Sequence, residues 1–330
     1  VYEFSKNFRN EGMDRTHNPE FTCMEIYVAY KDYNWMMDFT ERMLEKICMD
    51  VNGTTEVKVG DNVISFKAPF KRITMRDAIL EHTGFDINGK NEEELRAAAR
   101  GMGIEVDDTM GKGKLIDEMF GEKCEGSYIQ PTFITDYPIE MSPLTKRHRD
   151  NPELTERFEL MVNGKELANA YSELNDPIDQ YERFVEQMRL AEKGDDEAMI
   201  IDKDFIRALE YGMPPTSGMG IGMDRLVMLM TGQTTIQEVL LFPQMRPEKV
   251  EKRDNAEAYA TAGVPAEWVP VLQKAGVYTV AQLATANPGK LFQDICGLNK
   301  KFKLELKNPS QEDVKNWVAA SASQKEEEAE

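Results

Sequence analysis

Three glutamates, Glu159, Glu166 and Glu173, lie in a segment whose other members are mostly apolar or small. The same segment contains Asn169 and Tyr171 among alanines. A carboxylate in such surroundings costs free energy unless a cation or hydrogen bonds compensate its charge. Two neighbouring carboxylates suit a hard cation such as Mg²⁺. A single glutamate would favour a solvated position on an edge strand, but the combination favours a ligand site.

The segment has the pattern of a β-hairpin, with the Asn-Gly pair at 163–164 as its turn. Regular pairing across that turn would put Glu159 opposite Ala168 and diagonal to Glu166, on one face and close enough to share a cation. The remaining polar groups of the second strand would then point to the reverse face. If all five groups line one site, we expect a bulge or break near residues 167–169.

Two arginines could bring positive charge to these acids. Arg9 lies near the end of a predicted strand in 8-FRNEGMDRTHNPEF-21, before a loop that contains His17. Arg225 lies at the start of a predicted buried helix in 218-GMGIGMDRLVML-229. This glycine run is not a dinucleotide fingerprint, because the last glycine is missing and no P-loop lysine follows. Taken alone, Arg225 could be an ordinary surface arginine.

Hydrophobic periodicity predicts the elements that must position these groups. In 21-FTCMEIYVAY-30, the alternation puts Glu25 and Tyr27 on the face opposite the core face. The expected elements are two strands within 1–30, a helix at about 35–47, a hairpin at 57–66, a polar helical insertion at the surface at about 75–125, strands within 127–143, a hairpin at 157–174, and helices at 177–192 and from Met223.

Composition limits the class of protein. The chain has 330 residues and a formal net charge of −19, which disfavours broad, non-specific affinity for nucleic acid but not a local basic face. It has no apolar run long enough to cross a bilayer, so we expect no membrane association. The four cysteines form no CxxC pair, which favours a reducing cytoplasm over a disulfide framework or zinc site. Because the chain begins at Val1 in mid-pattern, we expect it to be part of a longer protein.

Together, 8-FRNEGMDRTHNPEF-21 and 218-GMGIGMDRLVML-229 resemble the second and third signature motifs of the class II aminoacyl-tRNA synthetases. The segments 23-CMEIYVAY-30, 164-GKELANAYSELNDP-177 and 212-GMPPTSGMGIGMDR-225 resemble the lysine-specific members. The resemblance covers residues 1–248 and implies an α+β fold, with an antiparallel sheet flanked by helices. The first motif and an anticodon-binding barrel would precede Val1.

The resemblance implies that the two arginines are catalytic and that five residues bind ATP. Arg9 would hold the α-phosphate and the substrate carboxylate, and Arg225 would hold the γ-phosphate and stack on adenine. Phe21 would cover the other face of adenine. Glu11 would meet the adenine edge, and His17 would approach the outer phosphates. Many members carry Arg directly before this histidine, where the present chain has Thr.

The resemblance also implies that Glu159 and Glu166 hold Mg²⁺ between the phosphates. Free lysine is the implied amino-acid substrate, with its ε-ammonium at Glu173 and Tyr27 and its α-ammonium at Glu25. Asn169 and Tyr171 are also implied to line this pocket. Gly220 is implied to form a part of its wall that has no side chain.

The implied function is that of a lysine–tRNA ligase, a cytoplasmic homodimer that forms lysyl-adenylate and transfers lysine to tRNA(Lys). A synthetase-like enzyme that lysylates a protein side chain remains an alternative. An aspartyl- or asparaginyl-tRNA synthetase would need a cationic group where Glu173 stands. A catalytically inactive binding protein is disfavoured by the intact arginines and acids.

The C-terminal part has a different pattern. We expect a linker at 249–263, a small all-α domain at 264–318 and a disordered acidic tail at 319–330. The run 275-AGVYTVAQLA-284 resembles helix-hairpin-helix modules and the C-terminal domain of the RNA polymerase α subunit, which bind nucleic acid or proteins. A cluster of Lys300, Lys301, Lys303 and Lys307 could contact tRNA. Packing of a helical appendage on the catalytic domain is the alternative.

Overall fold

The computed structural model describes residues 1–10, 12–192, 201–244 and 253–327. The chain divides into two compact units, an N-terminal unit Val1–Gln244 and a C-terminal unit Met245–Glu330. The N-terminal unit thus ends four residues before the predicted boundary at 248.

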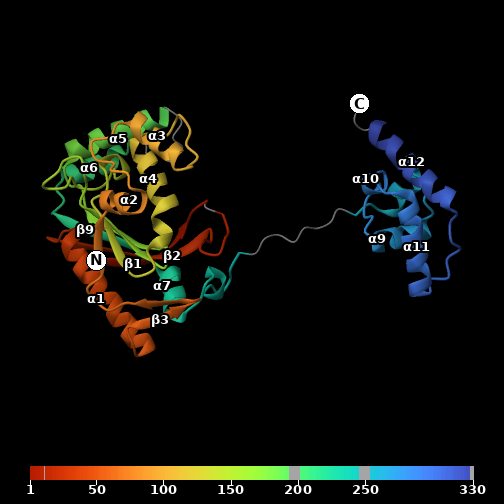
Figure 1. Cartoon of the computed structure of the whole chain (residues 1–330), viewed down its shortest axis with the longest axis horizontal. Helices are drawn as coiled ribbons and strands as arrows, with labels where there is room; N and C mark the ends of the chain where they lie inside the picture. Colours follow the sequence, from red (N-terminus) through yellow and green to blue (C-terminus); the bar gives the residue numbers. More distant parts are fainter. Residues whose placement is uncertain (11, 193–200, 245–252, 328–330) are drawn as a thin grey trace. The chain divides into compact units, whose positions relative to one another are not determined.

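A seven-stranded sheet is the framework of the N-terminal unit (Figure 1). Every neighbouring pair is antiparallel except β5 and β6, which are parallel. In spatial order the strands are β1 (Tyr2–Phe8), β2 (Glu20–Ala29), β9 (Thr216–Gly222), β8 (Lys165–Ser172), β7 (Arg157–Val162), β6 (Thr132–Thr135) and β5 (Lys71–Thr74). This largely antiparallel sheet with flanking helices confirms the predicted α+β class.

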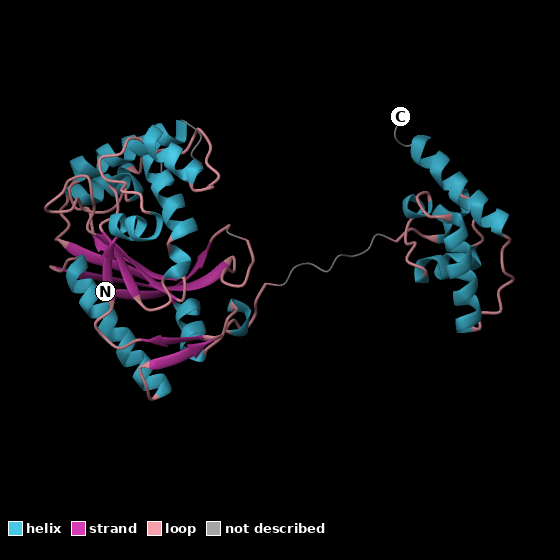
Figure 2. Cartoon of the chain, viewed as in Figure 1, coloured by secondary structure: helices cyan, strands magenta, loops and turns pink. Residues whose placement is uncertain are grey.

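Helices cover both faces of the sheet (Figure 2). On one face lie α1 (Tyr33–Asn52), α7 (Met223–Thr231) and the hairpin of β3 (Glu56–Val59) and β4 (Asn62–Ser65). On the other face lie α2 (Met75–Thr83), α3 (Glu92–Gly101), α4 (Lys112–Lys123), α5 (Pro177–Glu192) and α6 (Lys203–Glu210).

Alternation along the strands separates core from site. Met24, Ile26 and Val28 of β2 pack against the core formed with α1 and α7, as predicted. The residues between them therefore face the other side of the sheet. Asp32 caps α1 by accepting a hydrogen bond from Trp35 N at 3.0 Å, which fixes where this helix leaves the strand.

Two predictions for this unit need correction. The insertion at about 75–125 is not a polar surface appendage, because α2, α3 and α4 bury their own apolar cluster and pack it against Ile134 and Met161 of the sheet. Within 127–143 the only strand is β6, since Pro131 and Pro138 bracket it and lack the N–H that a longer strand needs. The parallel strand β5 was not predicted.

The C-terminal unit is helical. Its helices are α8 (Ala256–Thr261), α9 (Val269–Lys274), α10 (Val280–Leu283), α11 (Pro288–Phe302) and α12 (Gln311–Glu327). They enclose a separate core that includes Tyr259, Trp268, Leu272, Leu291 and Trp317. Within the ranges that the structure describes, no helix is long and apolar enough to span a membrane.

Two predicted boundaries in this unit are wrong. Residues 256–261 of the predicted linker form α8, because Tyr259 is fully buried and its hydroxyl donates to Val277 O at 2.9 Å. The predicted disordered tail is helical as far as Glu327. Buried Trp317 and Ser321 hold α12 against the core, and the small residues of 318-VAASAS-323 let the helix continue.

Candidate active site

A row of side chains crosses four strands on the sheet face that also carries the insertion. Glu25 of β2 pairs with Gly220 of β9, Gly220 with Asn169 of β8, and Asn169 with Glu159 of β7. Residues directly opposite one another project from the same face of a sheet. The fold therefore brings two acids and an amide into one line, with a gap at Gly220. A Cβ placed on Gly220 would meet only Cys23 Sγ, at 3.7 Å, so this position leaves open space above the sheet.

A second row lies two residues away along the strands. It consists of Tyr27, Gly218, Tyr171 and Arg157, in the same strand order. A Cβ on Gly218 would collide with the Glu173 carboxylate and would lie 2.9 Å from the Tyr27 ring. A side chain at 218 would displace the Glu173 carboxylate and crowd the Tyr27 ring, so glycine here lets Glu173 lie over this row.

A bulge in β8 allows the polar groups to share this face. Met161 pairs with Glu166 while the preceding Leu160 pairs with Ala168, so Leu167 is the extra residue. Leu167 is buried in the core on the far side of the sheet. This confirms the predicted break near 167–169. The predicted pairing of Glu159 with Ala168 is wrong, because the extra residue shifts Glu159 opposite Asn169.

Negative charge is concentrated beside Gly218. Burial and the nearby charge of Glu25 raise the pKa of Glu173 to about 8. The Tyr27 hydroxyl donates to Glu25 Oε2 at 3.1 Å, and burial and the charge of Glu173 raise the pKa of Tyr171. A carboxyl whose ionisation is suppressed in this way would be stabilised by a cationic ligand.

Arg157, at the β7 end of the second row, lies next to Glu159 of the first row. Its Nη2 is 2.5 Å from Glu159 Oε1, and its Nε donates to Asn169 Oδ1 at 3.2 Å. The guanidinium lies 4.4 Å from the centre of the Tyr137 ring. Burial and the charge of Glu166 raise the pKa of Glu159, although Arg157 opposes this shift. One arginine therefore does not balance two acids, so the Glu159–Glu166 pair fits a divalent cation that oxygen ligands from a substrate would share.

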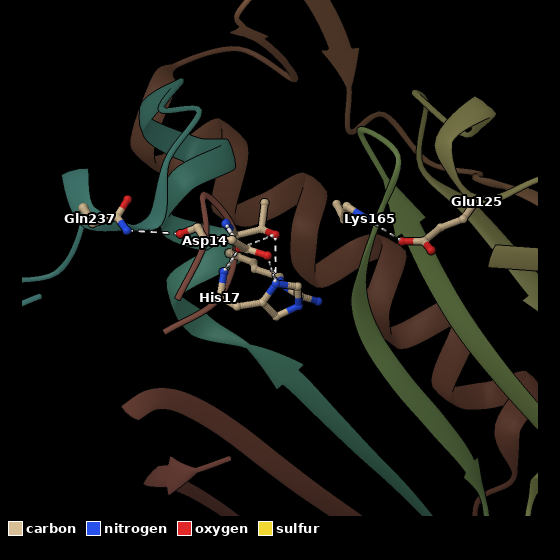
Figure 3. A network of polar contacts seen from close by, with 7 residues as sticks. Asp14, His17, Glu125, Lys165 and Gln237 are labelled. Atoms are coloured by element: carbon tan, nitrogen blue, oxygen red, sulfur yellow. Dashed lines mark hydrogen bonds and ion pairs between the residues drawn. The ribbon is translucent and has the colours of Figure 1, made fainter. Parts of the chain in front are cut away.

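A third group of contacts lies at the start of α7. Arg225 donates from Nη1 to Glu166 O at 2.6 Å and from Nη2 to His17 Nε2 at 3.0 Å. Because an arginine can only donate, Nε2 accepts, and the His17 proton lies on Nδ1, 2.8 Å from Asp14 Oδ2. Gln237 Nε2 donates to the backbone carbonyl of Asp14 (Figure 3).

The hydrogen bonds around Asp14 stabilise this arrangement. Burial acts against ionisation of its carboxyl, but bonds from Thr16 N, the His17 side chain and His17 N lower its pKa to about 2. Asp14 is therefore ionised at neutral pH and orients the His17 ring toward Arg225.

Arg9 directly follows β1 and faces Phe21 of β2. Its guanidinium lies 5.3 Å from the centre of the Phe21 ring. Burial and then Glu25 raise the pKa of the Cys23 thiol, which Arg9 lowers and Glu166 raises to smaller extents. Arg9, Glu25 and Glu166 are thus all close enough to Cys23 for their charges to affect the pKa of its thiol.

The structure places the predicted site residues of the strands on one face of the sheet, whereas Arg9 and His17 lie in loops and Arg225 reaches Glu166 and His17 from the start of α7. Glu11 lies outside the described residues. Sequence reasoning missed Arg157, Asp14 and Gly218. Arg157 could have been found, because it lies two residues before Glu159 on one strand and so shares its face. Asp14 had no comparable signal, since its role depends on loop contacts.

Comparison with known proteins agrees with the geometry. Residues 1–246 match the family model of class II tRNA synthetases (D, K and N), and the chain belongs to this family. Residues 228–324 also match a model described as a domain of unknown function, DUF4332.

Relatives place the chain within that family. It is 73% identical over 320 residues to a lysine–tRNA ligase of Porphyromonas gingivalis. The matched region covers 97% of this chain and 55% of that protein. It is 77% identical over 249 residues to a lysine–tRNA ligase of Christiangramia forsetii, covering 76% of this chain and 44% of that protein. The chain spans about half the length of the curated relatives it matches.

Proposed function

We propose that this chain carries the lysine-activating site of a lysine–tRNA ligase. The observation that carries the proposal is that Glu25 and Glu173 lie beside Gly218 and Gly220, while Arg9 acts on Cys23 of the same strand as Glu25 and the Arg225–His17 pair contacts Glu166. The names of the relatives support tRNA as the acceptor over a protein side chain. The acid at 173 disfavours an aspartate or asparagine substrate. Homodimer formation and a cytoplasmic location belong to the same proposal.

Recognition of lysine rests on charge. The ε-ammonium would pair with Glu173 beside Tyr27 and Tyr171, and the α-ammonium with Glu25. The ammonium takes the place of the proton that Glu173 otherwise holds, and breaking such a buried ion pair by removing one partner costs about 3–5 kcal/mol. An uncharged analogue would therefore bind more than about 100-fold more weakly.

The first reaction needs positioning more than acid–base catalysis. A lysine carboxylate oxygen attacks the α-phosphorus of ATP, forming the mixed anhydride while the bond to the β-phosphate oxygen breaks and its electron pair leaves with pyrophosphate. The carboxylate is already ionised at neutral pH, so it needs no general base. Arg9 and Arg225 align the reactants and compensate charge on the phosphates. Glu159 and Glu166 would hold Mg²⁺, which when bound compensates further phosphate charge. A ribose hydroxyl of the tRNA then attacks the lysyl carbonyl carbon and forms an ester, while the bond to the phosphate oxygen breaks and AMP leaves.

The test is lysine-dependent ATP–pyrophosphate exchange in the full-length protein. Arg9→Ala and Glu173→Gln should each reduce exchange at least about 100-fold, because each removes a charge that contacts a reactant. Arg42→Ala, an exposed arginine of α1, and Glu122→Gln, an exposed acid of α4, are matched controls that should keep wild-type exchange. Normal exchange in both Arg9→Ala and Glu173→Gln would contradict the proposal.

A further inference from the structure

The C-terminal unit exposes a phenylalanine between lysines. The Phe302 side chain is 48% exposed at the end of α11, although this unit has a separate apolar core. We propose that this lysine–phenylalanine patch binds single-stranded RNA, an unpaired segment of the tRNA, through a base stacked on the ring and phosphates near the lysines. The identity of the RNA rests on the proposed function. The patch consists of Lys274, Lys300, Lys301, Phe302, Lys303 and Lys307.

Two lysines from different helices flank the ring. Lys274 Nζ lies 4.7 Å and Lys301 Nζ 5.6 Å from the ring centre of Phe302. Lysines near helix ends also stabilise the C-terminal dipoles of α9 and α11. That role accounts for their charge but requires no exposed aromatic ring. A ring next to cations is the combination that stacks a base and contacts its phosphates.

The loop after Phe302 is held in one conformation. Asn299 is buried, and its Nδ2 donates to Leu306 O and to Asn308 Oδ1, both at 2.7 Å. Its Oδ1 accepts from Leu306 N at 3.3 Å. Lys303 has a φ of 50°, in the left-handed region that non-glycine residues seldom adopt. Lys303 and Lys307 are thus presented by a fixed loop, which lowers the entropy cost of binding.

The charge balance of this unit permits the approach of a polyanion. Residues 253–327 contain nine Lys and Arg and nine Asp and Glu, whereas the whole chain has a net charge of −19. Most of the negative charge therefore belongs to the N-terminal unit. Within the loop, Glu305 is the acidic residue beside the lysines, so the patch keeps a local excess of positive charge.

Unpaired bases distinguish the proposed ligand from other anions. The bases of a duplex are stacked inside it, and an acidic peptide would use the lysines without needing the ring. Stacking on the ring releases no counterions, so its contribution to affinity does not depend on the salt concentration. The lysines contribute through release of counterions, so their contribution falls as salt rises.

The experiment is fluorescence anisotropy with the full-length protein, a labelled 12-nucleotide oligouridylate and a duplex RNA of equal length, over a salt series. Phe302→Ala should weaken oligouridylate binding about 5- to 100-fold at every salt concentration without changing the salt slope. Lys301→Ala should weaken binding less and reduce the slope by about 0.7. Phe302→Trp should retain affinity. Lys290→Ala, an exposed lysine near the start of α11, is the matched control that should bind as wild type.

Two outcomes would overturn the inference. One is wild-type affinity of Phe302→Ala for oligouridylate. The other is binding of duplex as tight as that of the single strand, which would assign the patch to charge alone. Lysine-dependent exchange should be unchanged in all these variants. If the wild-type protein itself lacked exchange, the proposed function would fail, but oligouridylate binding would still test the patch.

Discussion

Glu173 shows how a single residue in this site favours ligand binding at the expense of stability. Its pKa is raised from 4.5 to about 8 by burial and by Glu25. Between these values the folded protein holds a proton that the unfolded chain releases. Stability without lysine should therefore fall as the pH rises from about 4.5 to 8.

The Glu173→Gln variant tests this linkage. It should melt at a higher temperature than wild type at pH 8 and at nearly the same temperature at pH 5, because the amide has no proton to lose. Saturating lysine should narrow the difference at pH 8 by stabilising only the wild type. Scanning calorimetry at the two pH values measures this, with Glu122→Gln as control. A lower melting temperature of Glu173→Gln at both pH values would contradict the assignment.

Arg157 compensates the charge of buried Glu159, and a pair of variants tests this structural role. Arg157→Met leaves Glu159 buried beside Glu166 without its cation, and should lower the free energy of unfolding by about 3–5 kcal/mol. The double variant Arg157→Met/Glu159→Gln should recover much of this loss, because the uncompensated charge is gone. Urea unfolding gives the four free energies of the cycle. A loss in the double variant equal to the sum of the losses of Arg157→Met alone and Glu159→Gln alone would show that the pair is not coupled.

At the scale of elements, the bulge in β8 decides which residues share the site. Glu166 and Asn169 are an odd number of residues apart, so a regular strand would turn them to opposite faces. Leu167, the extra residue, anchors the bulge in the core. Leu167→Ala should cost about 2–5 kcal/mol of stability and raise the Mg²⁺ concentration needed for exchange, with little change in KM for lysine.

The matched control for this prediction is Leu44→Ala, a fully buried leucine of α1 in the same core cluster. It should lose comparable stability without a change in Mg²⁺ dependence. If both variants respond alike to Mg²⁺, the bulge does not position the Glu159–Glu166 pair.

How far the sequence predicts these elements depends on how local the cause is. The Asn-Gly turn and the alternation in β2 are local, and both were predicted. The need for a bulge followed from the spacing of the polar groups, but the exact pairing of Glu159 depended on which residue was extra. The helical end of the chain was missed because its acidic composition resembles a disordered tail, while the burial of Trp317 depends on distant residues.

At the scale of the whole molecule, the two units have separate cores. Removing residues 253–330 from the full-length protein should leave lysine-dependent exchange within about twofold of wild type, because the described site residues all belong to the N-terminal unit. The same deletion should weaken oligouridylate binding at least as much as Phe302→Ala does. Loss of exchange on deletion would show that the units depend on each other.

The central claim is that this site selects lysine through the charge of its side chain. The most direct measurement compares lysine with norleucine, which lacks the ε-ammonium, in ATP–pyrophosphate exchange by the wild type and by Glu173→Gln. The account predicts more than about 100-fold preference for lysine in kcat/KM for the wild type, and less than about tenfold for Glu173→Gln. Undiminished preference in Glu173→Gln would contradict it.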